Sequence, residues 1–210
     1  MKASFLVLTI ALMSFAETTS KMKMYFNNED LIKIIEQYSK ASGQKFVIDP
    51  GVRGKISIFL QDPVTLDEAF NQMSSALAIN GFAISKQGDT MIVKSARNIQ
   101  RDLIEVSTQR PTLKPERMYS WVYTFKNISA EQVNRDLRIL PSKDGEMSVN
   151  SATNQVIFTD WSANLNRIGD LLAELDKKVD PEVAKIVELN KRTIKHEVKI
   201  IKKAQLDEEQ

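Results

Sequence analysis

The 210-residue chain contains no cysteine and only one histidine, and each shortage excludes a class of chemistry. Without thiols the chain can form no disulfide, no thiolate metal site and no cysteine nucleophile. The one imidazole, His196, lies in a charged C-terminal stretch. A solvated surface side chain is the simpler interpretation there, because a general base needs an oriented partner in a pocket. We therefore predict no catalytic, cofactor-binding or metal-binding residues, and we expect a protein that is not an enzyme.

The net charge is also small, +2 at pH 7 from 29 basic and 27 acidic residues. A dedicated nucleic-acid-binding domain usually carries a clear basic excess on one face. The Gly51–Gly54 segment has the Gly-x-x-Gly form of a KH nucleic-acid loop, but it stands between two predicted strands and not between helices. We expect no nucleic-acid partner. Four aspartates fall at turns or helix caps and not in a metal-binding cluster: Asp49, Asp62, Asp67 and Asp160.

Long hydrophobic runs are absent except at the N-terminus. Lys2 precedes a nearly unbroken apolar run from Phe5 to Phe15, and Ser14 and Ala16 place small residues at the positions that signal peptidase prefers. The run is much shorter than the ~20 residues that cross a bilayer. We therefore predict a secretory signal peptide that is cleaved after Ala16, and a soluble mature protein without a membrane span.

The first part of the mature chain alternates strand and helix patterns in the order β-α-β-β-α-β-β. The first helix is predicted from an apolar stripe that begins at Leu31 and reaches Tyr38, with Gly43 at the position of a left-handed C-cap. The second helix is predicted to open on a capping box of Thr65 and Glu68. Neither helix can bury its stripe except against the sheet, so one small α/β sandwich module is expected.

The second part follows the order β-α-β-β-α. Its first helix is predicted to begin with a capping box of Ser129 and Gln132. Trp121 and Trp161 are candidate anchors for a partner, but completion of a small core is the more common role of such residues, and we favour it. The expected fold class is therefore α+β. The expected organisation is a signal peptide over 1–16, a first module over 22–95, a linker over 96–117, a second module over 118–177 and a charged helical tail over 178–210.

Two segments lie outside these modules. Prolines and charges predict that residues 96–117 form an exposed linker with a short strand near 103–106. The tail over 178–210 is rich in lysine and glutamate, with apolar residues near helical spacing. Two interpretations of the tail remain open: an amphipathic helix that packs on a partner or on another copy, and a solvated, partly frayed helix.

The segment Ser42–Ile58 resembles the first periplasmic domain of bacterial secretins, which is shared with TonB-dependent signalling receptors. The family pattern of a glycine after the helix, then Phe-Val-Val-Asp-Pro, then Val-x-Gly-Lys-Val is matched by Gly43, by Phe46–Pro50 and by Val52–Ile56. The second module is similar to the repeated, KH-like ring-building domain of secretins. That likeness rests on Asn150–Asp160 and on a last helix that ends in Leu175-Asp176.

The resemblance implies a scaffold protein in the periplasm, within or near an outer-membrane complex, that can form a homo-oligomer. Secretins continue into a membrane pore, for which the residues after Asp176 show no counterpart, so we expect an accessory or adaptor component of a type II secretion or pilus system. The implied partners are an inner-membrane secretion component and secretin rings. Two candidate strand edges, which lie over 23–26 and 55–59, supply the predicted partner-binding residues: Lys23, Tyr25, Lys55, Ser57 and Phe59.

The sequence also bears on two alternative functions, a signalling module and a periplasmic hydrolase. A signalling module would contact a transmembrane regulator of the kind found with TonB-dependent receptors, but the KH-like second module argues against it. A periplasmic hydrolase would need a paired nucleophile and base, and no such pair stands out in the sequence.

Overall fold

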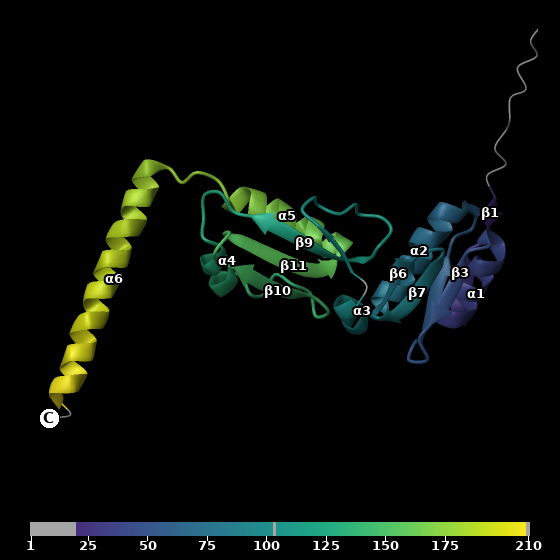
Figure 1. Ribbon diagram of the computed structural model, residues 1–210, viewed down its shortest axis with the longest axis horizontal. Coiled ribbons are helices and arrows are strands. Elements are labelled where there is room, and N and C mark those ends of the chain that lie inside the picture. The colour runs from purple at the N-terminus through teal and green to yellow at the C-terminus, as the bar shows by residue number, and fades with distance from the viewer. Residues whose placement is uncertain (1–19, 103, 209–210) are drawn as a thin grey trace, which may run out of the picture. The chain divides into compact units, whose positions relative to one another are not determined.

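The computed structural model of the chain describes residues 20–102 and 104–208 (Figure 1). The signal peptide expected over 1–16, with its cleavage at Ala16, lies outside the described residues. The chain divides into two units, Met1–Ser95 and Ala96–Gln210, which are described separately below.

Two helices of the first unit follow the apolar stripes expected from the sequence. Helix α1 (Leu31–Ser42) begins after Asp30, whose side chain accepts a hydrogen bond from the Ile32 N–H, and it ends at Gly43 with φ of 72°. Helix α2 (Leu66–Ile79) begins after Thr65, whose hydroxyl accepts from the Glu68 N–H at 3.2 Å. The glycine cap and the threonine cap are therefore confirmed.

The strands of the first unit form three small sheets. The two-residue strands β1 (Lys21–Met22) and β5 (Val64–Thr65) pair, as do β2 (Tyr25–Asp30) and β4 (Lys55–Phe59). The third sheet has the order β3-β7-β6, formed by β3 (Lys45–Ile48), β7 (Thr90–Ser95) and β6 (Phe82–Gln87), with β3 parallel to β7. The core collects apolar side chains from helices and strands, among them Met24, Phe26, Leu31, Ile34, Ile35, Met73, Leu77 and Val93.

The Gly-x-x-Gly segment forms the turn between β3 and β4, as its place in the sequence predicts. The Asp49 carboxylate accepts from the Gly51 N–H at 2.8 Å, and the Gly54 carbonyl accepts from the Leu31 N–H at 3.0 Å. Gly54 has φ of 138°, and a Cβ there would lie 2.7 Å from the side-chain oxygen of Asn80. Close packing and backbone conformation therefore explain the second glycine of this motif.

The second unit places two helices, α4 (Ala130–Asp136) and α5 (Ser162–Leu175), against a four-stranded sheet. The strand order of this sheet is β10 (Glu146–Asn150), β11 (Gln155–Trp161), β9 (Met118–Thr124) and β8 (Glu105–Ser107). Phe158, Leu165, Ile168 and Leu172 are fully buried in its core, and Trp121 packs with them. Trp161 is also buried, so the preference for tryptophans in the core is confirmed. This mixture of small sheets and helices confirms the expected α+β fold class.

The segment over 96–117 differs from the exposed linker expected there. It contains helix α3 (Ala96–Asp102) and strand β8 (Glu105–Ser107), and β8 pairs in parallel with β9. The short strand expected near 103–106 is therefore present, one to two residues later in the chain.

The rest of this segment is held against α5 by polar contacts. The Glu116 carboxylate accepts from the Ala163 N–H at 3.2 Å, in the first turn of α5, and the Arg110 guanidinium pairs with Asp170 at 2.6 Å. Burial raises the pKa of Glu116 despite that hydrogen bond. Residues 105, 106, 108–110 and 112–114 are exposed, as expected of a linker, but these polar contacts fix the segment to α5.

A buried aspartate ties the end of β11 to the loop before β10. Asp160 is fully buried, and its carboxylate accepts from the N–H and the hydroxyl of Ser142, each at 2.6 Å. The Trp161 N–H and the Asn164 amide also donate to it, at 2.7 and 2.6 Å. Local hydrogen bonding therefore accounts for this residue, as expected from its position at a helix start.

Asp176, at the C-terminal end of α5, joins that helix to the segment after β9 in the same way. Its carboxylate accepts from the Lys126 and Asn127 N–H groups at 2.9 and 2.7 Å. Burial acts to raise the pKa of Asp176, but the backbone donors of Asn127, Lys126 and Ile128 outweigh it and hold the pKa below the ordinary value of 3.8.

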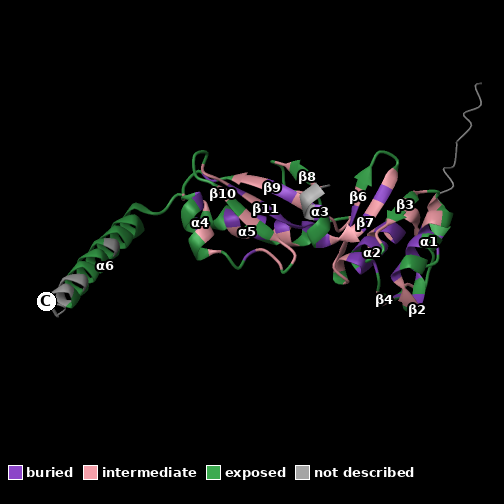
Figure 2. Cartoon of the chain, turned by 60° about the horizontal axis from the view of Figure 1, so that its bottom comes forward, coloured by how far each residue is buried: buried purple, intermediate pink, exposed green. Residues whose placement is uncertain are grey.

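After Asp176 the chain continues into helix α6 (Pro181–Glu208), which covers most of the segment expected to be a helical tail. Every α6 residue whose burial is described is exposed (Figure 2). Within residues 20–102 and 104–208, no helix combines the length and the apolar character that crossing a bilayer requires.

The expected capping box at Ser129 is wrong, because its side chain makes no capping hydrogen bond. Asn154, in the turn between β10 and β11, replaces it: its side-chain oxygen accepts from the Ala130 N–H at 2.8 Å. The Asn154 amide donates to the carbonyls of Phe125 and Ile128, both at 3.0 Å, and its φ is 54°. A side chain distant in sequence therefore satisfies the start of α4.

This arrangement predicts an order of stability among substitutions at Asn154. Alanine and glycine both remove the three side-chain hydrogen bonds, but only alanine is strained at positive φ. We expect Asn154→Ala to lower the free energy of unfolding of the second unit by about 2–4 kcal/mol, and Asn154→Gly to lower it by about 1 kcal/mol less. Urea unfolding followed by tryptophan fluorescence reports on this unit alone, because both tryptophans belong to it. Equal losses for the two variants would contradict the backbone argument.

Candidate protein-interaction surface

The antiparallel pair β2–β4 forms a two-stranded ribbon with one buried and one exposed face. Tyr25 lies opposite Phe59, and Phe26 lies opposite Ile58. Phe26 and Ile58 are buried in the core of the first unit, as is Met24 just before the strand. Because successive side chains of a strand point to opposite faces, Tyr25 on β2 and the odd-numbered residues of β4 point outward.

The five predicted partner-binding residues all belong to the exposed side of this ribbon or its approach: Lys23, Tyr25, Lys55, Ser57 and Phe59. Tyr25 is 56% exposed and Phe59 is 55% exposed, and their ring centroids lie 5.4 Å apart at an interplanar angle of 56°. Lys23 precedes the strand, and Lys55 lies opposite Asp30 at the other end. Two segments expected as separate candidate edges are therefore neighbours on one surface.

A bulge bends this ribbon between Phe26 and Glu29. Asn28 lies in the bulge with φ of 52°, and its N–H donates to the Ser57 hydroxyl at 2.9 Å. Asparagine tolerates this left-handed conformation better than most residues. Asn28 is a contributor to the surface that the periodic pattern did not indicate, although an Asn-Asn pair inside a strand is a recognisable turn signal.

The ribbon also offers backbone hydrogen-bonding groups. Within residues 20–102, β2 and β4 pair with no strand except each other. Each therefore has an outer edge on which N–H and C=O groups have no strand partner, and such edges can accept an added strand.

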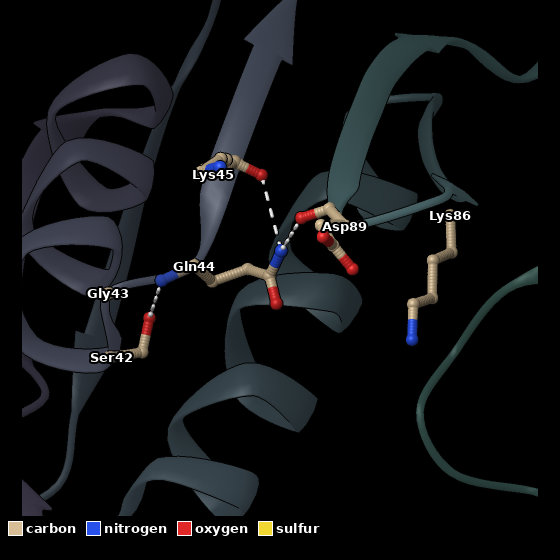
Figure 3. Close-up of a pocket in the computed structure, with 6 residues that line it drawn as sticks. All are labelled: Ser42, Gly43, Gln44, Lys45, Lys86 and Asp89. Carbon is tan, nitrogen blue, oxygen red and sulfur yellow. Dashed lines mark hydrogen bonds between the residues drawn. The ribbon is translucent and has the colours of Figure 1, made fainter.

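A hollow of about 320 Å³ lies elsewhere in the first unit, at the end of α1 and beside the β6–β7 turn (Figure 3). The Gln44 side-chain amide donates to the carbonyl of Asp89 at 2.7 Å. The Ser42 hydroxyl donates to the Tyr38 carbonyl and accepts from the Gln44 N–H, so it serves the helix end. Lys45 and Lys86 complete the lining. No base stands beside the hydroxyl here, and the hollow contains no arrangement for nucleophilic chemistry.

Metal binding finds no support in the part of the chain that the structure describes, since no three histidine, aspartate or glutamate side chains gather there as a possible ligand set. The features that remain are exposed surface: an aromatic pair, flanking lysines and two strand edges.

Comparison with known families identifies both units. Residues 24–93 match the family model described as the GspD-like N0 domain, and residues 120–180 match the bacterial type II/III secretion system short domain. The chain therefore belongs to the secretin family of type II secretion systems, of which it contains these N-terminal domains. The family assignment expected from the motifs is confirmed, and the family is a structural component of secretion machinery.

Relatives agree with this assignment. The chain is 27% identical to secretin XcpQ of Pseudomonas aeruginosa over 71% of its own length and 22% of the relative, and 23% identical to secretin GspD of Vibrio cholerae over 95% of its length and 30% of the relative. It thus spans less than a third of the length of these secretins. A Klebsiella pneumoniae type II secretion outer-membrane complex of PulD, PulS and the PulC HR domain contains the same fold, with a TM-score of 0.65 at 22% identity, covering 74% of this chain and 27% of that one. The alternative of a signalling module gains no support from these comparisons.

The exposed aromatic pair is predicted to contribute little to stability. Exposed cross-strand pairs are worth roughly 0.2–1 kcal/mol, so Tyr25→Ala and Phe59→Ala should each lower the free energy of unfolding by less than about 1.5 kcal/mol. A double-mutant cycle should give a coupling energy of about 0.5 kcal/mol. Thermal unfolding followed by circular dichroism measures these values. A loss of ~3 kcal/mol or more, as expected for truncation of a buried aromatic, would assign the pair to the core.

Proposed function

We propose that the chain acts in the periplasm as a docking component of a secretin-type secretion machine, and that it works by surface recognition and not by catalysis. The docking surface is the outer face of the β2–β4 ribbon with its free edges. The single observation that carries this proposal is the exposed Tyr25–Phe59 pair on a ribbon whose other face is anchored in the core.

The anchored inner face supports this role because it holds the outer face rigid. Two aromatic rings already in contact lose little side-chain freedom when a partner covers them, so more of the interaction energy is retained as affinity. Aromatic side chains are enriched among the residues that dominate binding energy, and lysines at the rim steer encounter with an acidic partner surface. Lys23 is exposed two residues before Tyr25, and Lys55 is exposed at the opposite end of the ribbon.

The partner proposed for this surface is a small HR-type domain of an inner-membrane secretion component. Support comes from the Klebsiella complex that shares the fold, because that complex contains the PulC HR domain together with the secretin PulD. The unpaired edges of β2 and β4 suit a partner that contributes a strand.

The second unit is proposed to contact copies of itself or secretin rings sideways. The outer strands of its four-stranded sheet, β8 and β10, support this role. Val106 on β8 is exposed, and so is Ile139 in the loop before β10, so both apolar side chains are available for such contacts.

The double substitution Tyr25→Ala/Phe59→Ala tests the docking proposal. Binding of a PulC-type HR domain, measured by isothermal titration calorimetry, should weaken at least about tenfold because two central aromatic contacts are lost. Circular dichroism should show an unchanged fold, since both side chains are exposed.

Ile79→Ala is the matched control, because Ile79 is 74% exposed on α2 of the same unit but lies outside the ribbon. It should bind within about twofold of the parent, as expected of truncation outside an interface. The docking proposal is wrong if the double variant binds as tightly as the parent, or if Ile79→Ala weakens binding by the same factor.

A further inference from the structure

Helix α6 carries an exposed apolar stripe, whose first residue, Val187, also lines a hollow with Ile128 and Gln132. Val187, Ile194, Val198 and Ile201 are between 43% and 59% exposed. At 3.6 residues per turn these four side chains fall within an arc of about 60°. They lie on one face of the helix, defined here as the α6 stripe, which Asn190 and Lys191 interrupt between Val187 and Ile194.

The same stretch is strongly basic. Between residues 191 and 203 there is one carboxylate, Glu197, among six basic residues: Lys191, Arg192, Lys195, Lys199, Lys202 and Lys203. The chain as a whole has a net charge of only +2, so the positive charge is concentrated here. Arg192 pairs with Glu188 one turn earlier, but Lys195 and Lys199 are exposed on the face beside the stripe.

We propose that α6 lies on the surface of an anionic phospholipid bilayer, with the α6 stripe in the interface and the lysines on the headgroups. A basic amphipathic helix gains from both apolar burial and attraction to anionic lipid. Long lysine side chains can reach the headgroups while their stems cover apolar surface. The helix is not apolar enough to cross the bilayer, so it would lie in the plane of the surface.

Charge also argues against a second copy of α6 as the occupant. Parallel pairing of two such helices in register would bring the two basic segments together, and like charges at close range disfavour association. The positions between the stripe residues, Asn190 and Glu197, add polar groups to the seam that a helix pair would bury. A negatively charged surface avoids the repulsion between basic segments, and the hydrated headgroup region leaves these polar side chains in contact with water.

Co-sedimentation of the full chain with two kinds of vesicle tests the proposal. One kind is phosphatidylcholine alone, and the other is phosphatidylcholine with an equal part of phosphatidylglycerol. The measured quantity is the ratio of the two partition coefficients, which removes any contribution that the apolar N-terminal run makes equally to both. The ratio should be at least about tenfold in favour of anionic vesicles, and it should fall toward unity in high salt.

Three double variants locate the effect. Lys195→Glu/Lys199→Glu should lower the ratio at least about tenfold. Lys45→Glu/Lys86→Glu makes the same change in net charge at two exposed lysines of the first unit and should change it less than about twofold. Ile194→Ser/Ile201→Ser should weaken binding to anionic vesicles without altering the charge.

Equal partition onto neutral and anionic vesicles would overturn the proposal, and so would a ratio that Lys195→Glu/Lys199→Glu leaves unchanged. Light scattering without vesicles supplies a further test. A dimer that Ile194→Ser/Ile201→Ser dissociates would assign the stripe to a second copy of the chain and overturn the assignment to lipid.

Discussion

The alternation of side chains along β4, and along β2 before its bulge, is the constraint on which the proposed surface depends. Phe26 and Ile58 are held in the core, and this fixes Tyr25 and Phe59 on the opposite face as a preformed pair. Shifting either strand by one residue would exchange the two faces, bury the lysines and expose the core. The apolar contacts that stabilise the first unit therefore also set the composition of its exterior.

In the second unit, polar side chains hold segments that are distant in the sequence in place. Asn154, Asp160 and Asp176 each accept or donate several hydrogen bonds that join segments far apart in the sequence. A small domain buries little apolar surface relative to its size, so fully satisfied side-chain clamps of this kind help to specify its loops. Substitution of such residues disturbs the scaffold without touching an interaction surface.

Much of the fold could be predicted from local sequence, because helix stripes and caps are local. The buried face of α1 from Leu31 to Tyr38 and the caps at Gly43 and Thr65 followed directly from spacing. Pairing between distant segments could not be derived in this way. The ribbon register, the packing of residues 104–117 on α5 and the replacement of Ser129 by Asn154 as the cap of α4 all depend on contacts across more than twenty residues. All five predicted partner-binding residues are exposed, but their assembly into one surface could be recognised only in the structure, and their role in binding stays a prediction.

Hydrogen–deuterium exchange of the full chain, with and without a PulC-type HR domain, tests the central claim most directly, because it maps protected amides without substitution. If the β2–β4 ribbon is the docking surface, added protection should be confined to residues 23–30 and 55–60, because a partner covers the outer face and edges of the ribbon. Protection centred on the hollow beside Gln44, or on the second unit alone, would contradict it.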